Sequence, residues 1–173
     1  MLALYDIIIL LGDCMTDKEY MQIAIDISKK AKYPYGAIVV KNDKIIGRSD
    51  AIIKKSGDRL YTHSEYRAIQ NAIKSGFAGD RYGGLYGGLE NCTIYTSCQP
   101  CMICMGVILY KKIKKIVYGA TLSDSSKYVV QEIETDTKEL AKISNIEEVE
   151  IVPELMRKEA VAVLKEWNKR SKL

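Results

Sequence analysis

The chain has 173 residues, of which 47% are hydrophobic and 28% are charged. These proportions are ordinary for a globular domain and exclude an intrinsically disordered chain. The formal net charge of +4, from 26 basic and 22 acidic residues, is too balanced to indicate nucleic-acid binding by itself. The apolar run at residues 7–11 is far shorter than the ~20 residues of a membrane-spanning helix, so we expect no membrane span.

Apolar residues at spacings of three and four predict helices, and alternating or short apolar runs predict strands. The expected helices cover residues 16–31, 63–75, 101–110 and 156–167. The expected strands cover residues 37–40, 45–46, 92–96, 113–118 and 148–152. Because helices and strands alternate, we expect one layered α/β domain with helices on both faces of a sheet. The glycine-rich stretch 79–89 lacks the Gly-Lys-Ser/Thr ending of a phosphate loop and is expected to be a connection.

The expected compartment determines how the five cysteines are interpreted. The start of the chain shows neither the basic stretch nor the cleavage pattern of a secretory signal, so we expect a cytoplasmic protein. There the five cysteines stay reduced, and a clustered C-x-x-C pattern indicates metal binding or catalysis rather than a disulfide. Cys14 and Cys92 have no partner at metal-ligand spacing and are expected to be buried thiols.

A metal site is predicted where two of the expected helices begin. Cys101 and Cys104 are three residues apart in the first turn of one helix, where the helix dipole favours the thiolate. The single histidine of the chain, His63, opens another helix, and Glu65 follows two residues later. One imidazole and two thiolates beside a carboxylate are typical of a zinc site whose fourth position is open.

The chemistry of such a site is hydrolytic. Zinc lowers the pKa of a bound water to roughly 7. Glu65 is then the expected catalytic residue, which moves protons from the water to the substrate and to a departing amine. Residues two apart lie on nearly opposite sides of a regular helix, so the metal must sit at the helix end. The patterns H-x-E at 63–65 and P-C-x-x-C at 100–104 together form the signature of zinc deaminases.

Two structural alternatives stay open at this point. Cys98 can be the fourth zinc ligand, which gives a closed Cys₃His site with no position for water. The chain would then be a non-catalytic binding protein in which zinc has a structural role. Cys101 and Cys104 can instead form a redox dithiol, although His63 and Glu65 would then have no role.

At these motifs the sequence resembles the cytidine and nucleotide deaminase superfamily, in its branch of guanine, cytosine and tRNA adenosine deaminases. The resemblance starts near Met15 and is carried by YPYGAIVVKNDKIIG, THSEYRAIQNA and TSCQPCMICMGVILYKKIKKIVYGA. It implies a three-layer α/β/α sandwich around a mixed five-stranded sheet. It also implies a zinc-dependent deaminase domain over residues 15–173, an N-terminal extension over residues 1–14, and a homodimer.

The resemblance also implies roles for individual residues. His63, Cys101 and Cys104 match the zinc ligands of the family, and Glu65 matches its proton shuttle. The remaining candidates are substrate contacts, namely Tyr35, Ser64 through its backbone, Asp50 and Gln99. Of these, Asp50 stands where the branch usually has a substrate-binding asparagine, with Ala51 equally alignable. Gln99 replaces the acidic or small residue that often precedes the Pro-Cys pair.

The expected reaction is hydrolytic removal of an exocyclic amine, as ammonia, from a nucleobase or nucleoside. Guanine or a related purine is favoured, because Tyr35 replaces the small residue typical of tRNA editors and residues 120–140 resemble the free-base enzymes. The alternative within catalysis is adenosine-to-inosine editing in tRNA, which the basic ending WNKRSKL favours.

Overall fold

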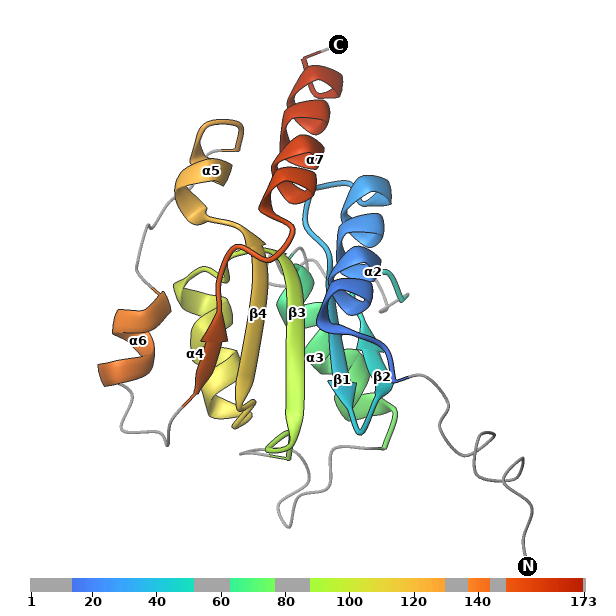
Figure 1. Ribbon diagram of the computed structural model, residues 1–173, viewed down its shortest axis with the longest axis vertical. Helices are drawn as coiled ribbons and strands as arrows, with labels where there is room; N and C mark the ends of the chain where they lie inside the picture. The colour runs from blue at the N-terminus through green and yellow to red at the C-terminus, as the bar shows by residue number, and fades with distance from the viewer. Residues whose placement is uncertain (1–13, 52–62, 77–87, 130–136, 144–148, 173) are drawn as a thin grey trace, which may run out of the picture.

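The computed structural model describes residues 14–51, 63–76, 88–129, 137–143 and 149–172. These residues form a five-stranded mixed sheet in the order β2-β1-β3-β4-β5, with helices on both faces (Figure 1). The predicted three-layer α/β/α sandwich is confirmed. Residues 1–13 of the expected extension lie outside the described residues, as do residues 79–87 of the glycine-rich stretch.

The sheet combines an antiparallel half with a parallel half. Its strands are β1 (Ala37–Lys41), β2 (Lys44–Arg48), β3 (Cys92–Cys98), β4 (Lys115–Ala120) and β5 (Glu150–Val152). β1 pairs antiparallel with β2 and β3, whereas β3 pairs parallel with β4, which pairs parallel with β5. The predicted turn between β1 and β2 is confirmed, because Asn42 and Asp43 both adopt positive φ angles, 47° and 59°, as this type of hairpin turn requires.

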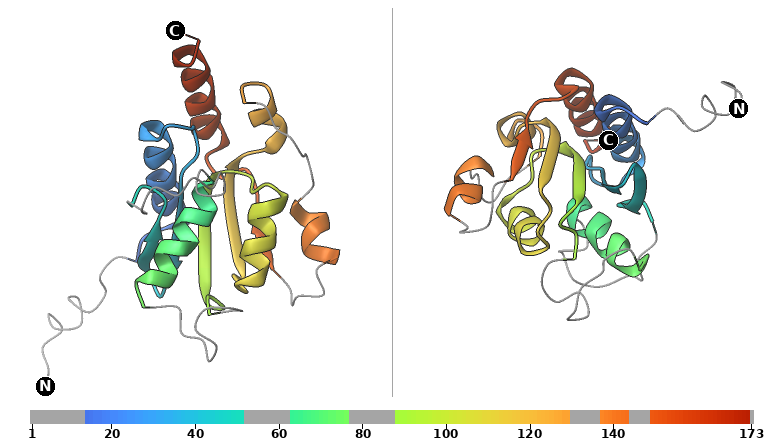
Figure 2. Two further views of the ribbon diagram at one scale, coloured as in Figure 1. Left: turned by 180° about the vertical axis from the view of Figure 1, so that it is seen from behind. Right: turned by 60° about the horizontal axis from the view of Figure 1, so that its bottom comes forward.

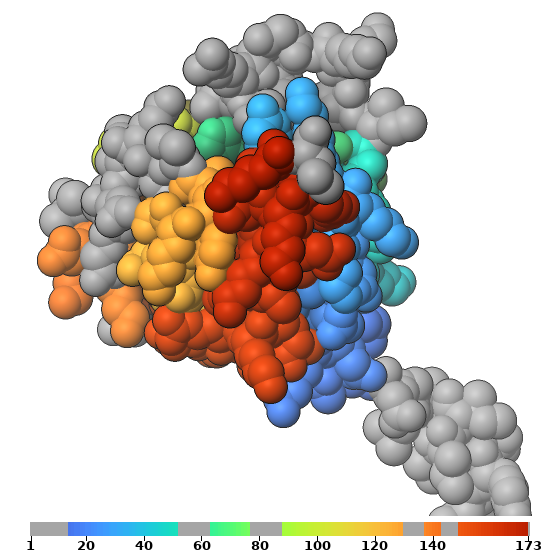
Figure 3. Space-filling model, turned by 90° about the horizontal axis from the view of Figure 1, so that it is seen from above, coloured from blue at the N-terminus to red at the C-terminus, as the bar shows by residue number. Residues whose placement is uncertain are grey.

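The helices form the two outer layers. One face of the sheet carries α2 (Asp17–Lys30) and α7 (Arg157–Arg170), and the other carries α3 (Ser64–Lys74) and α4 (Met102–Tyr110), as the rear view in Figure 2 shows. The predicted capping box of Thr16 and Glu19 starts α2. Seen from above, α7 lies between α5 (Leu122–Ser126) and α2 (Figure 3). Among the described residues, no helix combines the length and the hydropathy needed to cross a membrane.

Two glycines let helices approach the sheet closely, one on each face. A Cβ atom at Gly36 would lie 2.1 Å from the carbonyl oxygen of Ala24 in α2. A Cβ atom at Gly47 would lie 2.2 Å from the carbonyl oxygen of Ala68 in α3. Neither position accommodates a side chain without displacing a helix, which gives the glycine of the YPYGA segment a packing role.

Several element boundaries differ from the sequence prediction: β2 and β3 are longer than expected, and α7 continues to Arg170. β4 begins at Lys115 rather than at residue 113, because Ile113 still donates its backbone N–H to Ile108 O at the end of α4. The short helices α5 and α6 (Thr137–Ile143) were not predicted. Both are too short for periodicity to reveal, although Thr121 and Asp124 form a capping box that marks the start of α5.

Candidate metal centre

The predicted ligands lie at two helix N-termini on the same edge of the sheet (Figure 2). His63 is the N-cap residue of α3, and Cys101 is the N-cap residue of α4. Cys104 lies in the first turn of α4, whereas Pro100 precedes the cap and so lies just outside the helix. β3 ends at this edge, and the loop after it delivers Cys101 to the start of α4.

These side chains form a compact group, which we call the His-Cys-Cys group: His63, Cys101 and Cys104. His63 Nδ1 lies 3.6 Å from Cys101 Sγ and 3.4 Å from Cys104 Sγ, although the residues are 38 and 41 positions apart in the chain. All three possible ligand atoms lie within 4.8 Å of one another. Ligands of a tetrahedral zinc ion are separated by roughly 3.4–3.8 Å, given Zn–N and Zn–S bonds of about 2.0–2.3 Å. The donor chemistry and the spacing therefore fit zinc.

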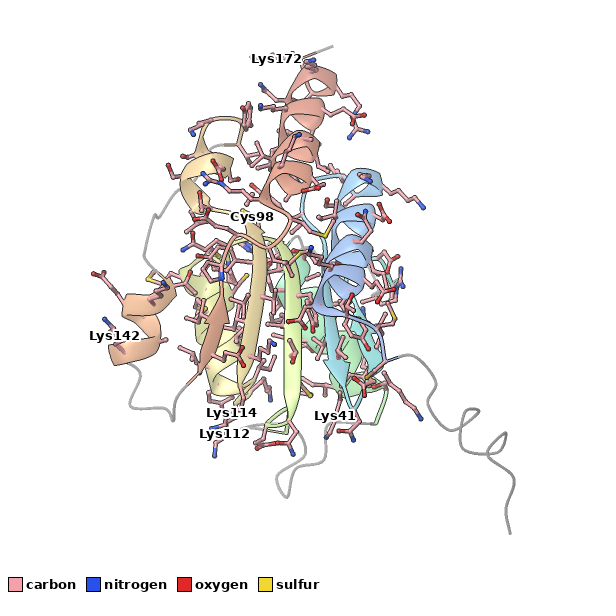
Figure 4. All side chains as sticks on the ribbon, viewed as in Figure 1. Lys41, Cys98, Lys112, Lys114, Lys142 and Lys172 are labelled. Atoms are coloured by element: carbon pink, nitrogen blue, oxygen red, sulfur yellow. The ribbon has the colours of Figure 1, made fainter. Side chains whose placement is uncertain are left out.

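Cys98 lies outside this group. Its thiol contacts the carbonyl oxygen of Thr121 at 3.7 Å, and its side chain belongs to the apolar cluster between the sheet and helices α2 and α7. Figure 4 labels Cys98 at the end of β3. Burial raises the pKa of the Cys98 thiol, which disfavours the thiolate that a metal ligand must supply. The geometry gives no support to a closed site with Cys98 as fourth ligand.

Glu65 lies directly beside the His-Cys-Cys group. Its side chain is buried, and its Oε2 atom lies 3.4 Å from Cys104 Sγ. Because His63 is a cap residue with extended backbone angles, its side chain does not follow the helical spacing. This explains how two residues that are two positions apart can face the same site.

The pKa values within the site reflect burial and the neighbouring thiols. Desolvation, together with the negative charge of Cys101, raises the pKa of the Glu65 carboxyl. A hydrogen bond from the Cys104 thiol lowers the pKa of Cys101 to about 4, with a further contribution from His63. The pKa of Cys104 is raised because it donates that bond. One cysteine of the pair is therefore held as a thiolate ready for a cation.

Of the four expected substrate contacts, Ser64 lies at the start of α3 and Asp50 lies just after β2. Ser64 is adjacent to the site, and its hydroxyl donates to Glu65 Oε2 at 3.0 Å. Asp50 binds Arg48 with both carboxylate oxygens, at 3.0 and 2.9 Å, in an exposed ion pair. That ion pair lowers the pKa of Asp50 and so favours its charged form.

The other two expected contacts lie towards α5 and α6. The Tyr35 and Ser125 hydroxyls are 2.8 Å apart. The side-chain amide of Gln99 donates to Thr137 Oγ1 at 2.7 Å and accepts from Leu122 N at 3.1 Å. Gln99 thus joins the metal-binding loop to the starts of both short helices.

Sequence reasoning missed one polar residue that touches the site and misjudged one thiol. Thr96, within β3, is fully buried, and its hydroxyl contacts Glu65 Oε1 at 3.1 Å. The signal available was a threonine within a strand whose other inward positions are apolar. Cys14 was expected to be buried but is exposed, because it precedes α2 at the edge of the described residues.

A family model described as the cytidine and deoxycytidylate deaminase zinc-binding region matches residues 15–120. This chain is a member of that family. The matched range includes the His-Cys-Cys group and Glu65, so zinc is the metal that the family implies for this site. The resemblance seen in the sequence motifs is confirmed.

Individual members of the deaminase family are similar over the same part of the chain. Guanine deaminase of Bacillus subtilis (strain 168) is 31% identical over 112 residues, which cover 61% of this chain and 66% of that protein. The tRNA-specific adenosine deaminase of the same organism is 32% identical over 108 residues, covering 60% of this chain and 62% of that protein. The chain therefore matches somewhat less than two thirds of the length of either relative.

The fold is also that of solved deaminases. The structure of guanine deaminase from Nitrosomonas europaea superposes with a TM-score of 0.70 and 17% identity, covering 89% of this chain and 85% of that one. At this identity the likeness concerns the fold alone. The relatives act on different bases, so substrate choice has to be argued separately.

Proposed function

We propose that this deaminase-family chain catalyses zinc-dependent hydrolysis of an exocyclic C–NH₂ group on a nucleobase or nucleoside, releasing ammonia. The observation that carries the proposal is the contact between Glu65 and Cys104, which lies where the start of α3 with His63 meets the start of α4 with Cys101. A proton-transferring carboxyl beside a three-ligand zinc site is the arrangement that hydrolytic deamination requires.

The residues of the site have two roles in the proposed reaction, metal binding and proton transfer. His63, Cys101 and Cys104 would hold the zinc, which would supply Lewis-acid activation of a water molecule. Glu65 would accept the proton that the attacking water loses and deliver it to a ring nitrogen, and would then carry the remaining proton of the added hydroxyl to the departing amine. Burial raises the pKa of the Glu65 carboxyl, which favours its proton-carrying form.

The expected substrate contacts are proposed here with two distinct roles. Ser64 is proposed to contact the substrate through its backbone, since its hydroxyl donates to Glu65, and Tyr35 is proposed to contact it through its ring, since its hydroxyl pairs with Ser125. Asp50 and Gln99 already use their polar atoms within the protein, Asp50 with Arg48 and Gln99 with α5 and α6. We therefore propose that these two shape the rim of the pocket rather than bind the base directly.

Guanine or a related purine is the proposed substrate. Tyr35, in place of the small residue typical of tRNA editors, and the likeness of residues 120–140 to free-base enzymes support this choice. The similarity to Bacillus subtilis guanine deaminase supports it as well. The nearly equal identity to a tRNA-specific adenosine deaminase keeps tRNA editing as the second candidate.

The decisive experiment measures ammonia release by the zinc-loaded protein from guanine, cytosine, adenine and their nucleosides. We expect turnover of guanine, and we expect the Glu65→Gln variant to retain zinc and lose at least about 100-fold in kcat. A protein that binds zinc but releases no ammonia from any of these compounds would contradict the proposed reaction on free bases.

An anticodon stem-loop in the same panel tests the second candidate. Editing of tRNA predicts inosine formation that falls steeply with added salt, because phosphate contacts release counterions. Guanine turnover without binding of the stem-loop removes this candidate.

We further propose that the chain forms a homodimer through the outer face of α4. That face is apolar yet exposed: Met102, Ile103 and Tyr110 are 39%, 44% and 48% exposed, and Gly106 lies between them. A large apolar strip on one helix is typical of an interaction surface. The resemblance to a branch whose members are commonly dimers supports a second copy as the partner.

A further inference from the structure

Thr96 occupies an unusual position in the central strand of the sheet. The inward row of β3 that faces α3 and α4 consists of Cys92, Ile94 and Thr96, and the first two belong to the apolar cluster on that face. Thr96 is 0% exposed, so its hydroxyl has no access to water. A buried hydroxyl needs protein partners, since leaving it unpaired costs about 1–3 kcal/mol.

The partners of this hydroxyl are specific. Thr96 Oγ1 lies 3.1 Å from Glu65 Oε1 and 3.1 Å from the carbonyl oxygen of Cys98. The other oxygen of the carboxyl, Oε2, faces Ser64 at 3.0 Å and Cys104 at 3.4 Å. The two oxygens of Glu65 therefore have separate surroundings, one on the strand side and one on the metal side.

We propose that Thr96 is the positioning residue for Glu65. Its hydroxyl holds Oε1 against the sheet and thereby keeps Oε2 directed at the metal side, where the reacting water and base meet. This inference deepens the proposed function and rests on it, since it assumes that Glu65 transfers protons in the reaction.

Threonine suits this task for two reasons. A hydroxyl both donates and accepts, so Thr96 can donate to Cys98 O while accepting from the carboxyl, or donate to the carboxyl itself. Its β-branched side chain has restricted χ1 freedom, and β3 is flanked by strands on both sides, with Ala37 and Tyr118 paired to Thr96. The anchor is therefore rigid, whereas glutamate alone has several rotatable bonds to order.

The first test compares hydroxyl removal with a matched control on the same strand. Thr96→Val keeps the shape and removes the hydroxyl, and we expect kcat to fall about 10- to 100-fold with little change in KM and in bound zinc. Thr96→Ser should recover most of the lost rate. Thr93→Val makes the same chemical change three residues earlier on β3, at a partly buried position, and should leave kcat unchanged.

Several outcomes would overturn the proposal. Thr96→Val with wild-type kcat would do so, as would a rate loss that Thr93→Val reproduces or that Thr96→Ser fails to recover. If Thr96→Val does not fold, Thr96→Ala removes the same hydroxyl and carries the same expectation relative to Thr96→Ser.

A second measurement does not depend on turnover. Thermal unfolding of the zinc-loaded wild type, Thr96→Val, Glu65→Ala and the double variant forms a double-mutant cycle. We expect the Tm loss of the double variant to be smaller than the sum of the single losses, because the two side chains share one contact. Additive losses contradict the proposal. A wild type inactive on every compound, combined with a coupled cycle, instead contradicts the proposed function and leaves the Thr96–Glu65 contact standing.

Discussion

At the scale of single residues, the site separates three neighbouring cysteines by their surroundings. Cys101 and Cys104 lie at the start of α4 against His63, where a thiolate is stabilised. Cys98, only three positions before Cys101, packs in the apolar cluster between the sheet and helices α2 and α7, and its thiol contacts Thr121 O. The sequence left open whether Cys98 joins the other two as a metal ligand, because only the fold shows against which residues each thiol packs.

The different surroundings of Cys98 and Cys104 predict that their serine variants bind different amounts of zinc. We expect Cys104→Ser to lose most of the bound zinc, because a serine hydroxyl is a far weaker ligand than a thiolate. Cys98→Ser should keep about one zinc per chain, since the side chain at position 98 does not belong to the His-Cys-Cys group. Elemental analysis of the purified variants measures both. Zinc lost from Cys98→Ser at unchanged folding would revive the closed Cys₃His site.

At the scale of elements, the site depends on how closely the helices pack on the sheet. Gly36 allows α2 to approach β1, and its backbone N–H donates to Ser97 Oγ of β3 at 3.0 Å. The same short segment carries Tyr35, whose hydroxyl meets Ser125 of α5. A shift of α2 would therefore be transmitted to the end of β3, from which the metal-binding loop departs.

We expect Gly36→Ala to destabilise the protein by about 3 kcal/mol, because the added methyl would overlap the carbonyl of Ala24 at 2.1 Å. Gly106→Ala is the matched control: within a single chain, no atom of the described residues lies within 4 Å of a Cβ built there, and alanine in a helix stabilises by about 0.5–1 kcal/mol. Denaturant unfolding of both variants measures the difference. Equal stability of the two variants would contradict this packing argument.

At the scale of the whole molecule, the two faces of the sheet have different tasks. The face with α2 and α7 is a packed layer that supports the sheet, and the face with α3 and α4 carries the metal ligands. Three of the four exposed large hydrophobic side chains among the described residues lie on α4. The helix that delivers the cysteines inward therefore presents an apolar strip outward.

We expect this strip to be covered by a second copy in solution. Tyr110→Glu, nine residues from Cys101 and so remote from the metal, should shift the protein from dimer to monomer, because it places a charge in an apolar interface. Tyr33→Glu is the control, since Tyr33 is 39% exposed and contacts Trp167 of α7 instead. Light scattering after size exclusion measures the mass. A monomeric wild type would contradict the homodimer.

Local signals in the sequence determine the principal helices and strands of this protein. The capping box at Thr16, the turn at Asn42-Asp43 and the apolar spacing along the longer helices are local signals, so the principal helices and strands could be predicted. The H-x-E and P-C-x-x-C patterns likewise predicted that His63, Glu65, Cys101 and Cys104 lie at two helix starts, and the structure brings these residues together.

Only the tertiary structure decided how those local pieces meet. The tertiary structure packs Cys98 against Thr121, away from the predicted metal ligands. It also brings Thr96 into contact with Glu65, 31 positions earlier in the chain, and pairs the side chain of Gln99 with Thr137. It also showed α5 and α6, whose length is below what periodicity can detect. The physical reason is that sheet pairing and helix packing join residues that are far apart in the chain, and no short-range pattern in the sequence records those contacts.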